Sequence, residues 1–257
     1  MGVEIIDFHM HPFIDPENNF CHYKESLKMD VQTTLSDMEA AGITAFCGSV
    51  ITRMNKENGF ELLKKCNRDA LKLREIYGEK YFPGIHVHPD YIRESVEELE
   101  WAAKEGVKLV GELVPYMCGW RDYSCRGLSD ILDVVERHDM VVSVHTINLE
   151  EMEKMAAEHK NIRFVFAHPG ERDLVLRHIE IMRKLDNVYL DLSGSGLFRY
   201  GLVRYLVDQV GADRILFGTD YPICNLDMFV GAVMGEKLTD RERELILSGN
   251  AKRLLRN

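Results

Sequence analysis

The chain has 257 residues, of which 46% are hydrophobic and 29% are charged. This composition is ordinary for a globular protein, and the length suits a single large α/β domain. Acidic residues outnumber basic residues by 42 to 32, giving a formal net charge of −10. Such a charge argues against nucleic acid and anionic membranes as general partners.

The amino-terminal residues lack the basic and apolar regions of a signal peptide. No apolar run approaches the roughly 18 residues that a membrane-spanning helix needs. The 6 cysteines contain no CxxC pair, so we expect free thiols rather than disulfides or a thiolate metal site. These features together predict a cytoplasmic protein without membrane contact.

Short strand-like runs alternate with helical patterns along the whole chain. We expect strands over residues 3–6, 43–48, 81–87, 107–111, 140–144, 162–167, 187–192 and 214–219. Helices are expected over residues 30–41, 59–77, 91–104, 128–138, 148–158, 171–185, 198–210, 239–247 and 251–255. The alternation predicts parallel strands with right-handed crossovers, and this many repeats favours a closed barrel. We therefore expect one α/β domain over residues 1–257, a (β/α)8 TIM barrel of regular or distorted geometry.

Six residues with metal-binding side chains follow the ends of five of these strands. They are His9, His11, Glu112, His145, His168 and Asp220. The carboxyl ends of the strands meet at one face of a barrel, so the six side chains are expected to converge. Imidazoles and carboxylates bind divalent ions. The pattern predicts a catalytic metal centre with one or two ions, Zn²⁺ being favoured and Mn²⁺ the alternative.

Each of these residues also has a structural explanation when it is taken alone. The pair His9 and His11 has a counterpart in His86 and His88, after the third expected strand, and spacing does not choose between the pairs. Glu112 is as well explained by an ion pair within the barrel. It is the position of all the candidates at the same end of the strands that favours a metal site.

These motifs resemble those of the amidohydrolase superfamily, specifically its amidohydrolase-2 branch. The matching segments are residues 7–11 (Asp-Phe-His-Met-His), 167–170 (Ala-His-Pro-Gly), 218–222 (Gly-Thr-Asp-Tyr-Pro) and 248–255, together with the histidine at 145. The resemblance implies that His9, His11 and Asp220 bind a first ion and that His145 joins them or binds a second. Glu112 would bridge two ions. In single-metal members the residue equivalent to His168 acts as an acid or base instead.

A metal-dependent hydrolase is the activity that we expect first. Asp220 would take the proton of a metal-activated water, and His168 would assist. The substrate would be a small, anionic ester, lactone or amide. The alternative is a nonoxidative decarboxylase of a small carboxylic acid, because the same branch contains both, and the six ligands do not separate them. A metal-binding scaffold without activity is a third hypothesis.

Loops after the strands carry the expected substrate-binding residues. Tyr116 and Arg121 follow the fourth expected strand, and Arg199 follows the seventh. Arginine forms paired hydrogen bonds with carboxylate or phosphate, which agrees with an anionic substrate. Association into a homo-oligomer stays open at this point.

Overall fold

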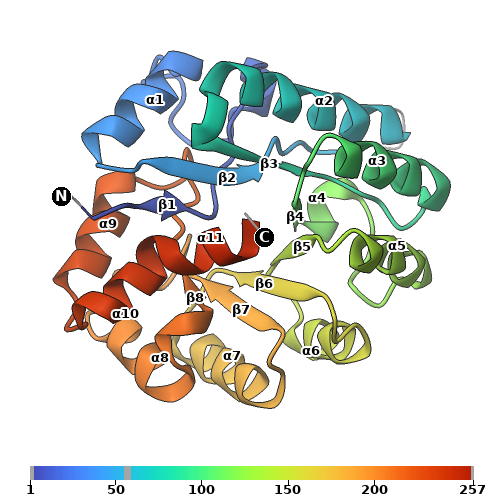
Figure 1. The fold of residues 1–257 in the computed structure, drawn as a ribbon. Helices are drawn as coiled ribbons and strands as arrows, with labels where there is room; N and C mark the ends of the chain where they lie inside the picture. The colour runs from blue at the N-terminus through green and yellow to red at the C-terminus, as the bar shows by residue number, and fades with distance from the viewer. Residues whose placement is uncertain (1–2, 55–58, 256–257) are drawn as a thin grey trace.

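The computed structural model describes residues 3–54 and 59–255. Eight parallel strands form one sheet in chain order, with helices around it, which confirms the expected TIM barrel (Figure 1). The strands are β1 Ile6–Asp7, β2 Ala45–Ser49, β3 Tyr81–Ile85, β4 Leu109–Leu113, β5 Val141–His145, β6 Arg163–Ala167, β7 Val188–Asp191 and β8 Ile215–Leu216.

The barrel closes between its first and last strands through backbone hydrogen bonds just beyond β1 and β8. The amide of Phe8 donates to the carbonyl of Phe217 at 2.8 Å, and that of Asp220 donates to the carbonyl of His9 at 2.8 Å. A parallel bridge also joins Met10 and Tyr221. The seam therefore continues past the short strands and brings the loops after β1 and β8 together.

Helices surround the strands, and the longer ones bury an apolar face (Figure 1). In α5 the buried side chains are spaced as one helical face: Leu128, Ile131, Leu132 and Val135. The α-helices are α1 Val31–Ala40, α2 Gly59–Tyr77, α3 Ile92–Lys104, α4 Pro115–Cys118, α5 Arg126–Arg137, α6 Leu149–Glu158, α7 Arg172–Lys184, α8 Leu202–Val210, α9 Leu226–Gly235, α10 Asp240–Glu244 and α11 Asn250–Leu255. Shorter turns are η1 Pro16–Asn18, η2 Gly78–Lys80, η3 Ala212–Arg214 and the π-helical η4 Leu245–Gly249.

An apolar cluster fills the lower part of the barrel. Ile6, Leu109 and Val141 from the strands pack with Leu254 and Leu255 of α11. In Figure 1 this helix lies across the centre of the barrel. Since α11 covers the amino-terminal end of the strands, the opposite, carboxyl end is the one available for a site.

Two helices were not expected, and several strands begin or end at other residues than the sequence indicated. The short α4 lies in what the sequence indicated to be a loop, and α9 had no predicted counterpart because Gly231 and Gly235 interrupt its apolar sequence. Strand β4 runs on to Leu113, so Glu112 lies within it rather than after it.

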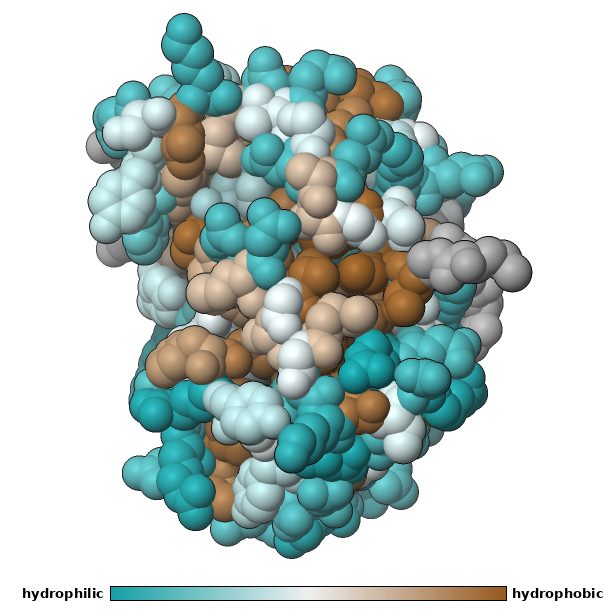
Figure 2. All heavy atoms as spheres, turned by 90° about the vertical axis from the view of Figure 1, so that its left-hand side faces the viewer, coloured by the Kyte–Doolittle hydropathy of each residue, from teal (hydrophilic) through white to brown (hydrophobic). Residues whose placement is uncertain are grey.

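The face that carries α1 and α9 has apolar side chains among its hydrophilic ones (Figure 2). A cavity of about 440 Å³ lies beside α1 and the start of α9, and exposed Leu27 and the segment Tyr221–Asp227 are among the residues that line it. Within residues 3–54 and 59–255, none of the helices combines the length and apolarity that crossing a membrane requires.

Candidate metal centre

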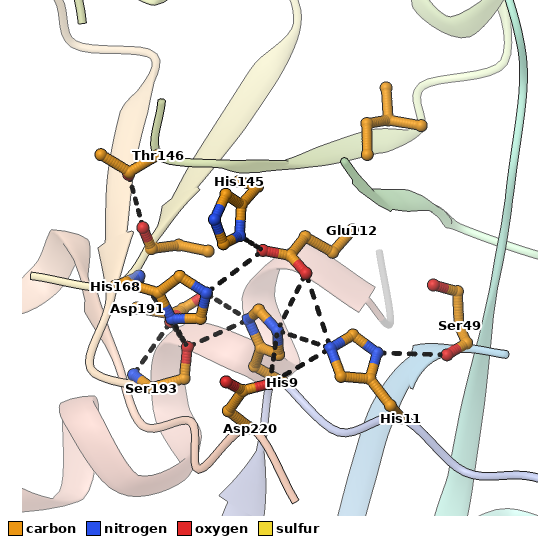
Figure 3. Close-up of polar contacts among 12 residues, drawn as sticks. His9, His11, Ser49, Glu112, His145, Thr146, His168, Asp191, Ser193 and Asp220 are labelled. Carbon is orange, nitrogen blue, oxygen red and sulfur yellow. Dashed lines mark hydrogen bonds and ion pairs between the residues drawn. The ribbon is translucent and has the colours of Figure 1, made fainter. Parts of the chain in front are cut away.

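The six expected ligands lie together at the carboxyl end of the barrel (Figure 3). Nε2 of His9 lies 3.1 Å from Nε2 of His11. Oδ1 of Asp220 lies 3.2 Å from the His11 nitrogen and 3.7 Å from the His9 nitrogen. Oε2 of Glu112 lies 3.5 Å from both. An oxygen of Glu112 in β4 and an oxygen of Asp220 in the loop after β8 thus each lie close to both histidine nitrogens from the loop after β1.

The hydrogen bonds behind His9 and His11 show that this cluster fits a divalent ion. Nδ1 of His11 lies 3.4 Å from the carbonyl oxygen of Ser49, which only accepts, so Nδ1 carries the hydrogen. Nδ1 of His9 lies 3.0 Å from a carboxylate oxygen of Asp191 in the same way. In the neutral rings both Nε2 lone pairs then point at each other, and a cation between them removes that repulsion.

The charges of the site also call for a cation. Burial alone would lower the pKa of His9, but the carboxylates of Asp191 and Glu112 raise it well above its usual value. Burial would raise the pKa of Glu112, whereas the surrounding histidines hold it well below its usual value. Buried carboxylates in this number are stable only beside positive charge, which a divalent ion supplies.

Glu112 connects this cluster to a second pair of histidines. Its Oε1 lies 2.8 Å from Nδ1 of His145 and 3.4 Å from Nε2 of His168. Among the residues that the structure describes, two groups of side chains have ligand atoms close enough to hold an ion: His9, His11 and Asp220, and His9, Glu112 and His168. His145 lies outside both groups, and its Nδ1 donates to Glu112.

Asp7 lies two residues before His9, so its side chain points to the same side of the extended chain as those of His9 and His11. It does not belong to the candidate ion-binding groups and supports them through hydrogen bonds. Its carboxylate accepts hydrogen bonds from the amide of His9 at 3.0 Å and from the hydroxyl of Thr219 at 2.6 Å. Burial raises the pKa of Asp7 to about 7 despite these bonds. Asp7 thereby ties the loop after β1 to the loop after β8, where Asp220 lies.

Sequence reasoning missed Asp191, at the end of β7, as a residue of the site, and Ser193 lies just after it. Both are completely buried behind His9 and His168. Asp191 ends a strand between two leucines, as the predicted ligands end theirs, and that signal was present in the sequence.

Two site residues have left-handed backbone conformations that side chains other than glycine rarely adopt. They are His168, with φ of 67°, and Asp220, with φ of 69°. Such conformations cost about 1–3 kcal/mol and concentrate at functional sites. Gly194 lies against the ring of His168, so closely that a Cβ atom there would lie 2.3 Å from Nδ1.

The second HxH pair is structural. Nε2 of His86 lies 3.1 Å from the carbonyl oxygen of Val50, and Nε2 of His88 lies 2.9 Å from that of Cys118. Burial lowers the pKa of His86 to about 4, so this ring is neutral. In both rings Nε2 is thus hydrogen-bonded to a backbone carbonyl outside the cluster.

The three expected substrate-binding residues lie in different surroundings. Tyr116 stands at the rim, where its hydroxyl lies 3.4 Å from Nε2 of His145. Arg121 is 90% exposed and pairs with Asp122, and Arg199 pairs with Glu171. The structure therefore brings Tyr116 to the cluster, whereas each arginine is exposed and already has a carboxylate partner.

A closed eight-stranded barrel with histidines and carboxylates gathered at its carboxyl end has the architecture of metal-dependent barrel enzymes. The amidohydrolase family model matches residues 6–256, and the chain belongs to this family, as its motifs predicted.

One curated relative is the gamma-resorcylate decarboxylase of Polaromonas sp. (strain JS666), which is 32% identical over 101 residues. That match covers 38% of this chain and only 28% of the relative. A solved 2,6-dihydroxybenzoate decarboxylase in complex with 2,6-dihydroxybenzoate has a TM-score of 0.77 at 18% identity, covering 97% of this chain and 98% of the other. A dihydroxybenzoic acid decarboxylase from Polaromonas sp. JS666, with manganese and 2-nitroresorcinol bound, has a TM-score of 0.75 at 18% identity, covering 99% and 97%.

These comparisons correct the expected activity. The prediction of a metal-dependent hydrolase is wrong, because the curated relative and the solved structures named above are decarboxylases, which are lyases. A divalent metal centre is supported, but zinc is not confirmed, since manganese is the ion bound in the solved neighbour. The six expected ligands were compatible with either reaction, so the residues alone favoured neither.

Proposed function

We propose that the protein is a metal-dependent, nonoxidative decarboxylase of a small hydroxylated aromatic acid. The observation that carries the proposal is the arrangement of His9, His11 and Asp220 as an ion-binding group directly beside His168, a largely buried histidine that is not a member of that group. The decarboxylase relatives support the reaction type and the substrate class.

The reaction breaks one carbon–carbon bond and needs one proton. The carboxylate leaves as CO₂, its bonding electrons stay on the ring carbon, and that carbon then takes a proton. His168 is the proposed donor: burial would lower its pKa, but the neighbouring Glu112 raises it above its usual value, which favours the protonated ring. Its left-handed backbone aims the ring into a cavity of about 260 Å³ that Asp220 and His145 also line.

A bound divalent ion would stabilise the negative charge on the substrate's phenolate and carboxylate oxygens. His9, His11 and Asp220 would hold it. We propose one ion per chain, because both candidate groups use His9 and one imidazole nitrogen binds one ion. Mn²⁺ is the proposed ion, and two ions bridged by Glu112 is the alternative that metal analysis tests.

Arg53 and Tyr116 are the residues proposed to meet the substrate at the rim. The guanidinium of Arg53 lies 5.8 Å from the ring centre of Phe20, and its charge lowers the pKa of Tyr116, although burial raises that pKa overall. A cation and a phenol near the rim suit an aromatic acid. Arg53 is proposed rather than Arg121 or Arg199 because its charge acts on Tyr116 at the rim.

The test is product analysis with manganese-loaded enzyme in D₂O. Incubation with 2,6-dihydroxybenzoate and with 5-carboxyvanillate is expected to release CO₂ from at least one of them. Mass spectrometry is expected to find one deuterium in the product, at the carbon that lost the carboxylate. Metal analysis by mass spectrometry is expected to give one ion per chain. Absence of CO₂ release from a panel of hydroxybenzoates by the loaded enzyme would refute the proposed activity.

The expected absence of nucleic acid and membrane partners, the cytoplasmic location and the single-domain organisation over residues 1–257 stay predictions. Self-association also stays a prediction. Size-exclusion chromatography with light scattering measures it directly.

A further inference from the structure

Asp191 and Ser193 connect two histidines that come from opposite parts of the chain. Oγ of Ser193 lies 3.1 Å from Nδ1 of His9 and 3.0 Å from Nδ1 of His168. The same hydroxyl hydrogen-bonds to Oδ1 of Asp191, and Oδ2 of Asp191 lies 3.0 Å from Nδ1 of His9. Figure 3 shows this network behind the two rings, on the side away from Glu112.

The direction of each hydrogen bond follows from the groups involved. An ionised carboxylate only accepts, so Ser193 gives its single hydroxyl hydrogen to Asp191. The oxygen of Ser193 can then only accept from the two imidazoles. Both Nδ1 atoms must therefore carry hydrogen, and both Nε2 atoms are the ones that face the centre of the site.

Asp191 also fixes the backbone around this network. Its Oδ1 accepts from the amide of Ser193 at 3.0 Å and lies 3.5 Å from the amide of His168. Because both side chains are fully buried, water does not compete for these bonds. The pair thereby holds the rings and the loop that carries one of them in a single arrangement.

We propose that Asp191 and Ser193 are positioning residues that set the same tautomer, with hydrogen on Nδ1, in His9 and His168. In His9 this leaves the Nε2 lone pair for the ion. In His168 it makes Nε2 the nitrogen that exchanges the catalytic proton, a consequence that rests on the proposed function. The tautomers themselves do not depend on which substrate the enzyme takes.

The experiment reads the tautomers directly by ¹⁵N NMR of histidine-labelled protein loaded with diamagnetic Zn²⁺. The pH is set high enough for His168 to be neutral. In the wild type, the signals of His9 and His168 are expected to show hydrogen on Nδ1. In Ser193→Ala, His168 is expected to populate the other tautomer, whereas His9 keeps its hydrogen on Nδ1 because Asp191 still accepts from it.

A second measurement is the affinity for Mn²⁺, followed by the electron paramagnetic resonance of the free ion. Asp191→Asn is expected to weaken binding roughly 10- to 100-fold, as is typical when the outer hydrogen-bond partner of a metal ligand is lost. Ser193→Ala is expected to weaken it less. The matched control is Ser248→Ala, which removes a buried hydroxyl from η4, and both its spectrum and its affinity are expected to equal those of the wild type.

A wild-type His168 with hydrogen on Nε2 would overturn the proposal without any variant, so it stays testable even where Asp191→Asn does not fold. Wild-type affinity and histidine signals in a folded Asp191→Asn protein would overturn it as well. Neither readout uses decarboxylation, so failure of the proposed substrate class would leave this result standing.

Discussion

Nε2 of His9 and Nε2 of His11 face each other at 3.1 Å, while an acceptor behind each ring holds Nδ1. This relationship explains why the first HxH pair, and not the second, belongs to the metal centre. In the second pair, Nε2 of each ring is bonded to a backbone carbonyl.

Replacing His11 by alanine is expected to remove an ion ligand while the barrel, whose apolar core lies below the site, stays folded. The affinity for Mn²⁺ should fall by more than the roughly 10- to 100-fold typical for losing an outer partner of a ligand. The matched control is His88→Ala, which should lower the free energy of unfolding but leave the affinity unchanged. Equal loss of affinity in both variants would contradict the assignment.

His168→Asn is expected to lower kcat roughly 10²- to 10⁴-fold, the range for losing a general acid. Asparagine tolerates the left-handed backbone at this position, so the fold should persist. Metal content should remain at the wild-type level. If the variant instead loses its ion, His168 is a ligand rather than the acid.

Arg53→Met is expected to raise KM for a carboxylate substrate about 10-fold or more, since hydrogen bonds to charged groups contribute about 1.5–3 kcal/mol. Arg121→Met serves as the comparison, because this side chain is 90% exposed and paired with Asp122. Steady-state kinetics of both variants separate the two residues. A larger KM effect for Arg121 would reverse the proposed roles.

Gly194→Ala is expected to displace the ring of His168 and to lower kcat, because the new methyl group would lie 2.3 Å from Nδ1. Gly201→Ala in the same loop imposes a comparable left-handed conformation, with φ of 90°, but its Cβ meets nothing within 4 Å. It should therefore lose stability, by roughly 1–2 kcal/mol, and keep its kcat. Similar kcat values for the two variants would argue against steric control of His168.

The contribution of His178 to the free energy of unfolding is expected to fall as the pH drops from about 6.5 towards 4. Burial lowers the pKa of His178 from 6.5 to about 4, so in this interval the unfolded chain binds a proton that the folded protein does not. This one group accounts for about 3 kcal/mol. Urea unfolding at pH 7.5 and 4.5 should show a smaller loss in His178→Met than in the wild type. An identical loss would mean that His178 does not contribute.

The barrel and its six-residue cluster were predictable because both depend on repeated local patterns. Strand–helix alternation predicts the topology. Polar residues at the carboxyl ends of the strands then gather at one face of the barrel. The roles within the cluster were not predictable in the same way. Whether His145 binds an ion or donates to Glu112 depends on ring orientation, which spacing does not encode.

Helix α9 and the Asp191–Ser193 pair show two further limits. The glycines of α9 weaken its helical pattern, and packing against the barrel compensates for them. Asp191 carried the same strand-end signal as the ligands, but its function depends on Ser193 and on two rings from distant segments.

The seam that joins the loops after β1 and β8 gives the ion a second consequence. The amide of Asp220 bonds to the carbonyl of His9, and these same two residues supply ligand atoms to one group. An ion bound there would connect the segment after the first strand to the segment after the last strand. At 100 times its dissociation constant it would add about 2.7 kcal/mol to the free energy of unfolding. Binding of the ion and the folding of the barrel are thus coupled. Where the ion is scarce, the protein would lose the proposed activity and part of its free energy of unfolding together.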